Sequence, residues 1–133
     1  MRSPNRFLGV ALGTVYVLIG VAGISLADDG VLLDVLQVNV VSSILHTLVG
    51  AALLLAALSN VSAARTVNSI TGAALLVLGL AGLFLVGSTL NILALDAMGN
   101  ALHFASAVPL LAAGLGADRA QSTHHSDRAS HYT

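Results

Sequence analysis

The 133-residue chain contains no cysteine and no tryptophan, and only 8% of its residues are charged. The absence of cysteine excludes disulfides, thiolate metal sites and cysteine nucleophiles. The five positive charges are too few for the basic face of a nucleic-acid-binding protein. An intrinsically disordered chain is excluded as well, because 56% of the residues are hydrophobic. Since a soluble domain carries about 25% charged residues, the shortage of charge indicates that lipid surrounds most of this chain.

Four stretches without Asp, Glu or Arg are long enough to cross a bilayer, which takes about 20 mostly apolar residues. They cover about residues 7–27, 38–58, 67–86 and 97–115. A soluble bundle would need polar outer faces, whereas every charge here lies outside the four stretches. The sequence therefore predicts an all-α integral membrane four-helix bundle within residues 1–116.

The remaining residues, 117–133, are polar and have no apolar periodicity, which predicts a disordered cytoplasmic tail. His124, His125 and His131 fall in this tail. Without a fixed scaffold, three histidines lose much conformational entropy when they bind a metal. We therefore interpret them as solvated side chains, and no metal site is predicted.

The charges alternate between the predicted connections. All five cations are arginines, located before the first span (Arg2, Arg6), between the second and third (Arg65), and after the fourth (Arg119, Arg128). The other two connections carry Asp28, Asp29, Asp34 and Asp96. The positive-inside rule then predicts a multi-pass protein of the bacterial plasma membrane with both termini and an Arg65 turn in the cytoplasm.

The N-terminus also resembles a cleavable signal peptide, with Ser25-Leu26-Ala27 as a small-x-small site before Asp28. The apolar run that precedes this site is longer than the roughly 7–15 residues of a signal h-region. We therefore favour an uncleaved first span.

The sequence contains an internal repeat. The segment Asn39 to His46 aligns with Asp96 to His103 at an offset of 57 residues. Gly13, Gly20 and Gly23 align with Gly72, Gly79 and Gly82 at an offset of 59. The pattern predicts two duplicated helical hairpins, related by a pseudo-two-fold axis along the membrane normal.

Glycines recur at helical spacing in the first and third spans. Because helices in lipid associate through close packing of small residues, we interpret these glycines as the seams on which the odd-numbered helices pack. A homodimer face is the alternative. The predicted packing set consists of Gly9, Gly13, Gly20, Gly23, Gly72, Gly79 and Gly82.

The second and fourth spans carry matching polar stripes at helical spacing, Asn39, Ser43 and His46 on one and Asp96, Asn100 and His103 on the other. Polar groups inside a membrane are costly unless they face protein, so both stripes should face the interior of the bundle. Asn39 and Asp96 should cap the two helices. We expect the imidazoles of His46 and His103 to bond to the other hairpin, and Tyr16 to need a partner for its hydroxyl.

Three functions fit these stripes. The first is interhelical hydrogen bonding, which fixes the register of the helices. In the second, His46 and His103 are the axial ligands of a haem b, although aromatic residues are scarce and no arginine is placed to meet the propionates. The third is a proton or solute path, but no acidic residue lies at mid-membrane.

We find no nucleophile elbow, no glycine-rich phosphate loop and no paired catalytic carboxylates. The sequence therefore predicts no enzyme. A structural or accessory component is the favoured interpretation, in contact with the lipid bilayer and with other membrane proteins or a second copy, and with no cofactor. A haem or small-ligand binder using His46 and His103 is the alternative.

The paired motifs, Asn39 followed by Leu45-His46-Thr-Leu-Val-Gly50 and Asp96 followed by Asn100-Ala-Leu102-His103, resemble those of a bacterial family of four-span membrane proteins, domain of unknown function 4383. Gly20 and Gly23 at the end of the first span add to the likeness, which covers residues 7–115. Ala107 stands where the repeat has Gly50, so the two seams need not be equivalent. The resemblance implies the fold and a membrane location, and it implies no activity, substrate or cofactor.

Overall fold

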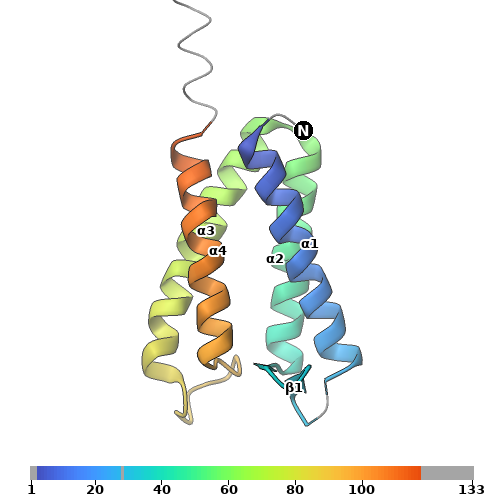
Figure 1. Cartoon of the computed structure of the whole chain (residues 1–133), viewed down its shortest axis with the longest axis vertical. Helices are drawn as coiled ribbons and strands as arrows, with labels where there is room; N and C mark the ends of the chain where they lie inside the picture. The colour runs from blue at the N-terminus through green and yellow to red at the C-terminus, as the bar shows by residue number, and fades with distance from the viewer. Residues whose placement is uncertain (1–2, 28, 118–133) are drawn as a thin grey trace, which may run out of the picture.

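The computed structural model describes residues 3–27 and 29–117. In this part of the chain lie four helices, each long and apolar enough to cross a membrane. The all-α prediction is thus confirmed (Figure 1). Residues 118–133 of the predicted tail, with its three histidines, lie outside the described residues. The helices are α1 (Pro4–Ser25), α2 (Val40–Ser59), α3 (Val61–Leu85) and α4 (Ala97–Leu115), and two short strands, β1 (Val31–Leu32) and β2 (Leu36–Gln37), lie between α1 and α2.

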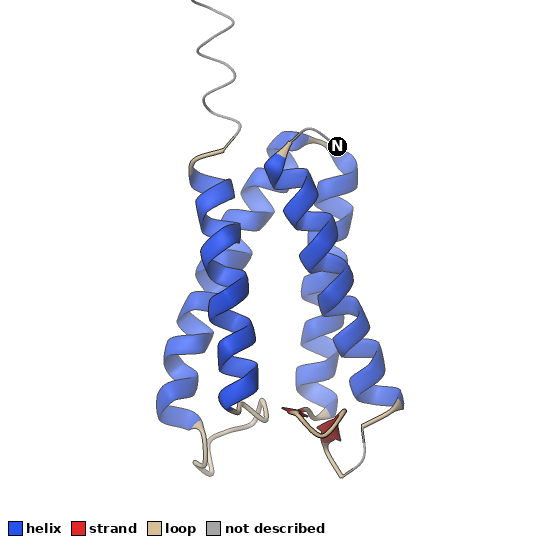
Figure 2. Cartoon of the chain, in the orientation of Figure 1, coloured by secondary structure: helices blue, strands red, loops and turns tan. Residues whose placement is uncertain are grey.

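The helices are arranged as two hairpins that stand side by side. Helix α1 packs mainly against α2, and α3 mainly against α4 (Figure 1). The start of α1, the α2–α3 junction and the end of α4 lie at one end of the bundle, and the strands and the α3–α4 loop lie at the other (Figure 2). We call these the arginine end, which holds Arg6 and Arg65, and the aspartate end, which holds Asp29, Asp34 and Asp96.

Capping side chains set the starts of the helices. Asn39 forms a capping box with Ser42 at the start of α2, where its side chain accepts a hydrogen bond of 2.8 Å from the Ser42 N–H. Asp96 accepts a bond of 2.7 Å from the Gly99 N–H at the start of α4. Both caps that the sequence predicted are therefore present, and each satisfies a backbone donor that the helix leaves unpaired.

The junction between α2 and α3 is shorter than predicted. Asn60 ends α2 and, in an extended conformation, also caps α3 by accepting a bond of 2.8 Å from the Ala63 N–H. Helix α3 thus begins at Val61, so the expectation of an Arg65 turn is wrong: Arg65 lies within α3. The reason is that one asparagine can terminate one helix and start the next, which needs no loop.

The small hairpin of β1 and β2 was not predicted. It pairs Val31 with Gln37 and Leu32 with Leu36 in antiparallel register. Its buried side chains Leu32 and Leu36, with Val38, pack on Ile19, Ala22 and Ala27. The hairpin therefore covers the end of α1 at the aspartate end.

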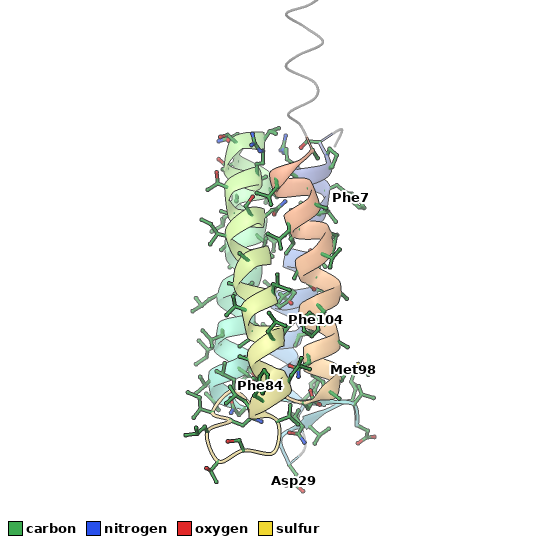
Figure 3. The ribbon with its side chains drawn as sticks, turned by 90° about the vertical axis from the view of Figure 1, so that its left-hand side faces the viewer. Phe7, Asp29, Phe84, Met98 and Phe104 are labelled. Atoms are coloured by element: carbon green, nitrogen blue, oxygen red, sulfur yellow. The ribbon has the colours of Figure 1, made fainter. Side chains whose placement is uncertain are left out.

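The core of the bundle is small. Its buried cluster is Tyr16, Leu53, Leu75, Ala107 and Leu110, with at least one residue from each helix. Most other large apolar side chains point outward, as the side chains along the helices in Figure 3 illustrate. Such an exterior is what contact with lipid requires.

Candidate functional site

The glycines of α1 lie where α1 meets α2. A Cβ placed on Gly13 would be 2.9 Å from the Gly50 carbonyl oxygen, and one on Gly20 would be 2.5 Å from the Ser43 carbonyl oxygen. Added Cβ atoms on Gly9 and Gly23 would meet side chains of α2, Ala57 and Ser43. Close packing of α1 on α2 thus depends on these four positions lacking a side chain.

The glycines of α3 make the corresponding approach to α4. A Cβ on Gly72 would lie 2.9 Å from Leu111 Cγ, and one on Gly79 would lie 3.1 Å from the Phe104 ring. Figure 3 places Phe104 at this seam between α3 and α4. At Gly82, an added Cβ would collide with the Asn100 amide. The predicted packing residues therefore join the helices within each hairpin.

Polar side chains join the two hairpins at the aspartate end. The Asn39 amide donates a hydrogen bond of 2.8 Å to the Ile92 carbonyl, in the loop before α4. In return, the Asp96 carboxylate accepts one of 3.0 Å from the Gln37 N–H, in β2. The two capping residues thus also connect one hairpin to the other.

A second polar junction, absent from the predicted stripes, joins the hairpins at the arginine end. The fully buried Asn5 amide donates to the Ala113 carbonyl over 2.9 Å, across to α4. Asn68, also fully buried, donates to the backbone carbonyl and side-chain oxygen of Asn5 over 2.9 and 3.0 Å. Sequence inspection missed this pair because asparagines near helix ends usually cap helices, and neither lies at the repeat offset of the other.

Between these junctions, His46 and His103 lie next to each other. Their ring centroids are 6.2 Å apart with an interplanar angle of 21°, and Tyr16 stacks on His46 at 5.4 Å. Among the described residues, α2 and α4 have no Cα atoms within 8 Å of each other. Side chains, above all these rings, therefore bridge the space between them.

The hydrogen bonds of the imidazoles differ from the prediction. His46 Nδ1 lies 2.6 Å from the Ser42 carbonyl of its own helix, and His103 Nδ1 has no partner within the described residues. The expectation that both bond to the other hairpin is therefore wrong. The reason is local: four residues earlier on α2, a helix carbonyl is within reach of the His46 ring.

Tyr16 contributes a third polar atom to this site. Its hydroxyl makes no hydrogen bond shorter than 3.5 Å to a described residue, and the Ser106 hydroxyl is close enough only for a weaker contact. Tyr16, His46 and His103 line a cavity of about 50 Å³, whose other walls are mainly leucines. We call this space the histidine cavity.

The histidine cavity does not fit a porphyrin. Its volume of about 50 Å³ is well below the roughly 300–1,000 Å³ of pockets for small-molecule ligands. Within the described ranges, no three His, Cys, Asp or Glu side chains are grouped closely enough to hold a metal ion. Apart from Tyr16, His46, His103 and Ser42, the side chains that line the cavity are apolar.

A second hollow lies on the outer surface of the second hairpin, near the aspartate end. This groove between α3 and α4 has a volume of about 370 Å³. It is lined by Gly82, Leu83, Val86, Ala97, Asn100, Ala101 and Phe104. Small residues create it: at the repeat offset of 57, the first hairpin has Val40 and Ile44 where the second has Ala97 and Ala101. We call it the α3/α4 groove, and this difference in side-chain size is the signal in the sequence that could have revealed it.

Comparison with known proteins gives one result. The model of the family described as domain of unknown function (DUF4383) matches residues 6–116. No curated protein and no solved structure matches the chain.

Proposed function

The chain belongs to the DUF4383 family, and we propose that it is an accessory component of a membrane that binds a transmembrane helix of a partner protein in the α3/α4 groove. The four apolar helices support the membrane location. The observation that carries the proposal is the groove itself, in which the small residues Gly82, Ala97 and Ala101 lie among larger apolar side chains. Helices approach one another most closely at such residues.

The Asn100 side chain favours a helix over a lipid tail as the occupant. Asn100 lines the groove, and its buried side-chain oxygen, which lies against Gly82, has no hydrogen-bond partner within the described part of the chain. A polar group in hydrocarbon is costly without a partner, and an acyl chain offers none. A helix with a hydroxyl or amide donor can pair with the Asn100 oxygen once the side chain rotates toward the groove.

The proposal also includes the identity of the membrane, the orientation of the bundle and the origin of the two hairpins. We take the membrane to be a bacterial plasma membrane, with the arginine end in the cytoplasm. We also take the hairpins to be products of a duplication, which the matching contacts of Gly13 and Gly72 with Leu54 and Leu111 support. Binding a partner helix in the groove requires no catalysis, so the proposal includes no enzymatic activity.

Photo-crosslinking in intact cells tests the groove. A benzophenone amino acid replaces Leu83, which lines the groove and is 61% exposed, or Leu18 of α1, which is 62% exposed. We expect the probe at position 83 to label a discrete membrane protein, and the probe at position 18 to label lipid. Filling the groove with the residues of the first hairpin, through Ala97→Val with Ala101→Ile, should abolish this product.

The matched control is Ala105→Ile, which enlarges an exposed alanine of α4 outside the groove and should leave the product unchanged. Lipid adducts alone at position 83, or a product that survives in the filled groove, would contradict the proposal. A crosslinked product of two copies of this chain would show that the occupant of the groove is a second copy and not another protein.

A second candidate is a binding site for a small hydrogen-bonding ligand in the histidine cavity. The buried Tyr16 Oη and His103 Nδ1 favour it, because neither has a hydrogen bond within 3.5 Å to a described residue. The volume of about 50 Å³ restricts such a ligand to a few atoms, since a single water needs about 10–15 Å³ by this measure.

A further inference from the structure

A polar hollow lies at the arginine end, on the opposite side of the membrane from the α3/α4 groove. Its volume is about 310 Å³. The lining side chains come from the start of α3 and the end of α4: Ser62, Arg65, Thr66, Ser69, Ile70, Gly114 and Leu115. No acidic side chain lines it within the described residues.

Arg65 is held at this hollow by one bond. Its Nε donates to the Gly114 carbonyl over 3.1 Å, which places the guanidinium at the negative end of the α4 dipole. No other hydrogen bond from its side chain to a described residue is present. The terminal nitrogens therefore remain as donors in the fork geometry that suits phosphate oxygens.

Hydroxyl groups and apolar side chains complete the hollow. Ser62 and Thr66 are exposed and add hydroxyl donors beside the guanidinium. Ile70 and Leu115 continue the lining, and they are 65% and 56% exposed. A phosphate at Arg65 would thus have an apolar surface next to it, where an attached acyl chain can lie.

The first hairpin has a matching arginine with bulkier neighbours. Arg6, 59 positions before Arg65, donates from Nε to the Ala57 carbonyl over 2.7 Å and from Nη2 to the Leu58 carbonyl over 3.5 Å. Phe7 and Val10 stand where the second hairpin has Thr66 and Ser69. Figure 3 shows Phe7 projecting outward at this end.

We propose that the hollow around Arg65 binds the headgroup phosphate of an anionic phospholipid. Basic pockets between transmembrane helices on the cytoplasmic side are suited to such headgroups. A free phosphate ion shares this chemistry, but it would leave Ile70 and Leu115 uncovered. This inference is independent of the groove and of any partner protein.

Native mass spectrometry of the full chain in mild detergent tests the proposal. The probes are phosphatidylglycerol and phosphatidylcholine with identical acyl chains, added in equal amounts. Both lipids carry a phosphodiester, but the trimethylammonium group of choline cancels its charge and would be placed next to Arg65, where no acidic side chain of the described residues compensates it. We therefore expect about tenfold preference for phosphatidylglycerol, which corresponds to about 1.4 kcal/mol. Arg65→Gln should remove the preference, as should Thr66→Phe with Ser69→Val, which installs the residues of the first hairpin.

The control variant is Arg6→Gln, which removes the same charge at the same end and should keep the preference. Thr66→Val, which nearly keeps the shape of the side chain, should lower the preference for phosphatidylglycerol. This variant takes the place of the double variant if the double variant does not fold. Equal loss in the Arg6 and Arg65 variants, or no loss in either hollow variant, would overturn the proposal. Displacement of phosphatidylglycerol by millimolar inorganic phosphate would also overturn it, because the site would then take a free anion.

Discussion

Single buried polar atoms differ in whether they have a partner. The Asn68 amide donates twice to Asn5, whereas His103 Nδ1 and the Tyr16 hydroxyl have no partner among the described residues. Leaving a buried donor or acceptor unsatisfied costs about 1–3 kcal/mol. The two donor bonds of Asn68 therefore stabilise the fold, although its own Oδ1 is unpaired among the described residues. His103 and Tyr16 weaken the fold unless a ligand pairs with them.

Apolar substitutions at these residues distinguish the two cases. Without a ligand in the histidine cavity, we expect His103→Leu and Tyr16→Phe to leave the Tm in detergent unchanged or to raise it. Asn68→Leu should lower it, because Asn5 loses its donor, by about 1–3 kcal/mol of unfolding free energy. A lower Tm for His103→Leu, together with the loss of a small bound mass, would instead support the ligand candidate.

Helices within a hairpin depend on how closely their backbones approach. At Gly20, an added Cβ would lie 2.5 and 2.6 Å from backbone atoms of Ser43 and Thr47. At Gly79, the matching position of the second hairpin, it would lie 3.1 Å from the ring of Phe104. A ring can shift more easily than a helix backbone, so the two seams differ in their tolerance, although the sequence pattern is the same.

Alanine at each glycine tests this difference. Gly20→Ala should cost about 1–3 kcal/mol, the usual range for overpacking, because α1 and α2 must separate. Gly79→Ala should cost less, since only the Phe104 side chain has to move. Thermal unfolding of the two variants in the same detergent makes the comparison, and a larger loss for Gly79→Ala would contradict this description of the seams.

The whole molecule is two hairpins joined by polar contacts at both ends and by the histidine cavity between them. Asn39 and Asp96 connect the hairpins at the aspartate end, and Asn5 and Asn68 connect them at the arginine end. The two ends also differ in charge, which determines how the bundle should be oriented in the membrane.

Single cysteines can report this orientation, because the native chain contains none. Ser59, at the arginine end, and Thr89, at the aspartate end, are both exposed. We expect Thr89→Cys to react with a membrane-impermeant maleimide in intact cells, and Ser59→Cys to react only after permeabilisation. The reverse pattern would place the arginine end outside and contradict the positive-inside assignment.

Much of the architecture could be predicted from residue spacing. The four helices and the caps at Asn39 and Asp96 depend on local signals, namely apolar length and a polar residue before it. The junction at Asn60 and the strands at the aspartate end could not be predicted as readily. Both depend on the positions of neighbouring helices. In addition, the sequence around a polar residue near a helix end is similar whether that residue caps a helix or belongs to a loop.

The sequence by itself determined that the chain crosses a membrane and that its charges lie at the helix ends, because both follow from composition and order along the chain. It also aligned His46 with His103 at an offset of 57 residues. Only the tertiary structure decided which polar atoms have partners: His46 bonds to its own helix, His103 has no described partner, and Asn68 reaches Asn5. Hydrogen bonds and cavities depend on distances of a few ångströms between helices, and those distances are set by the small residues along the seams.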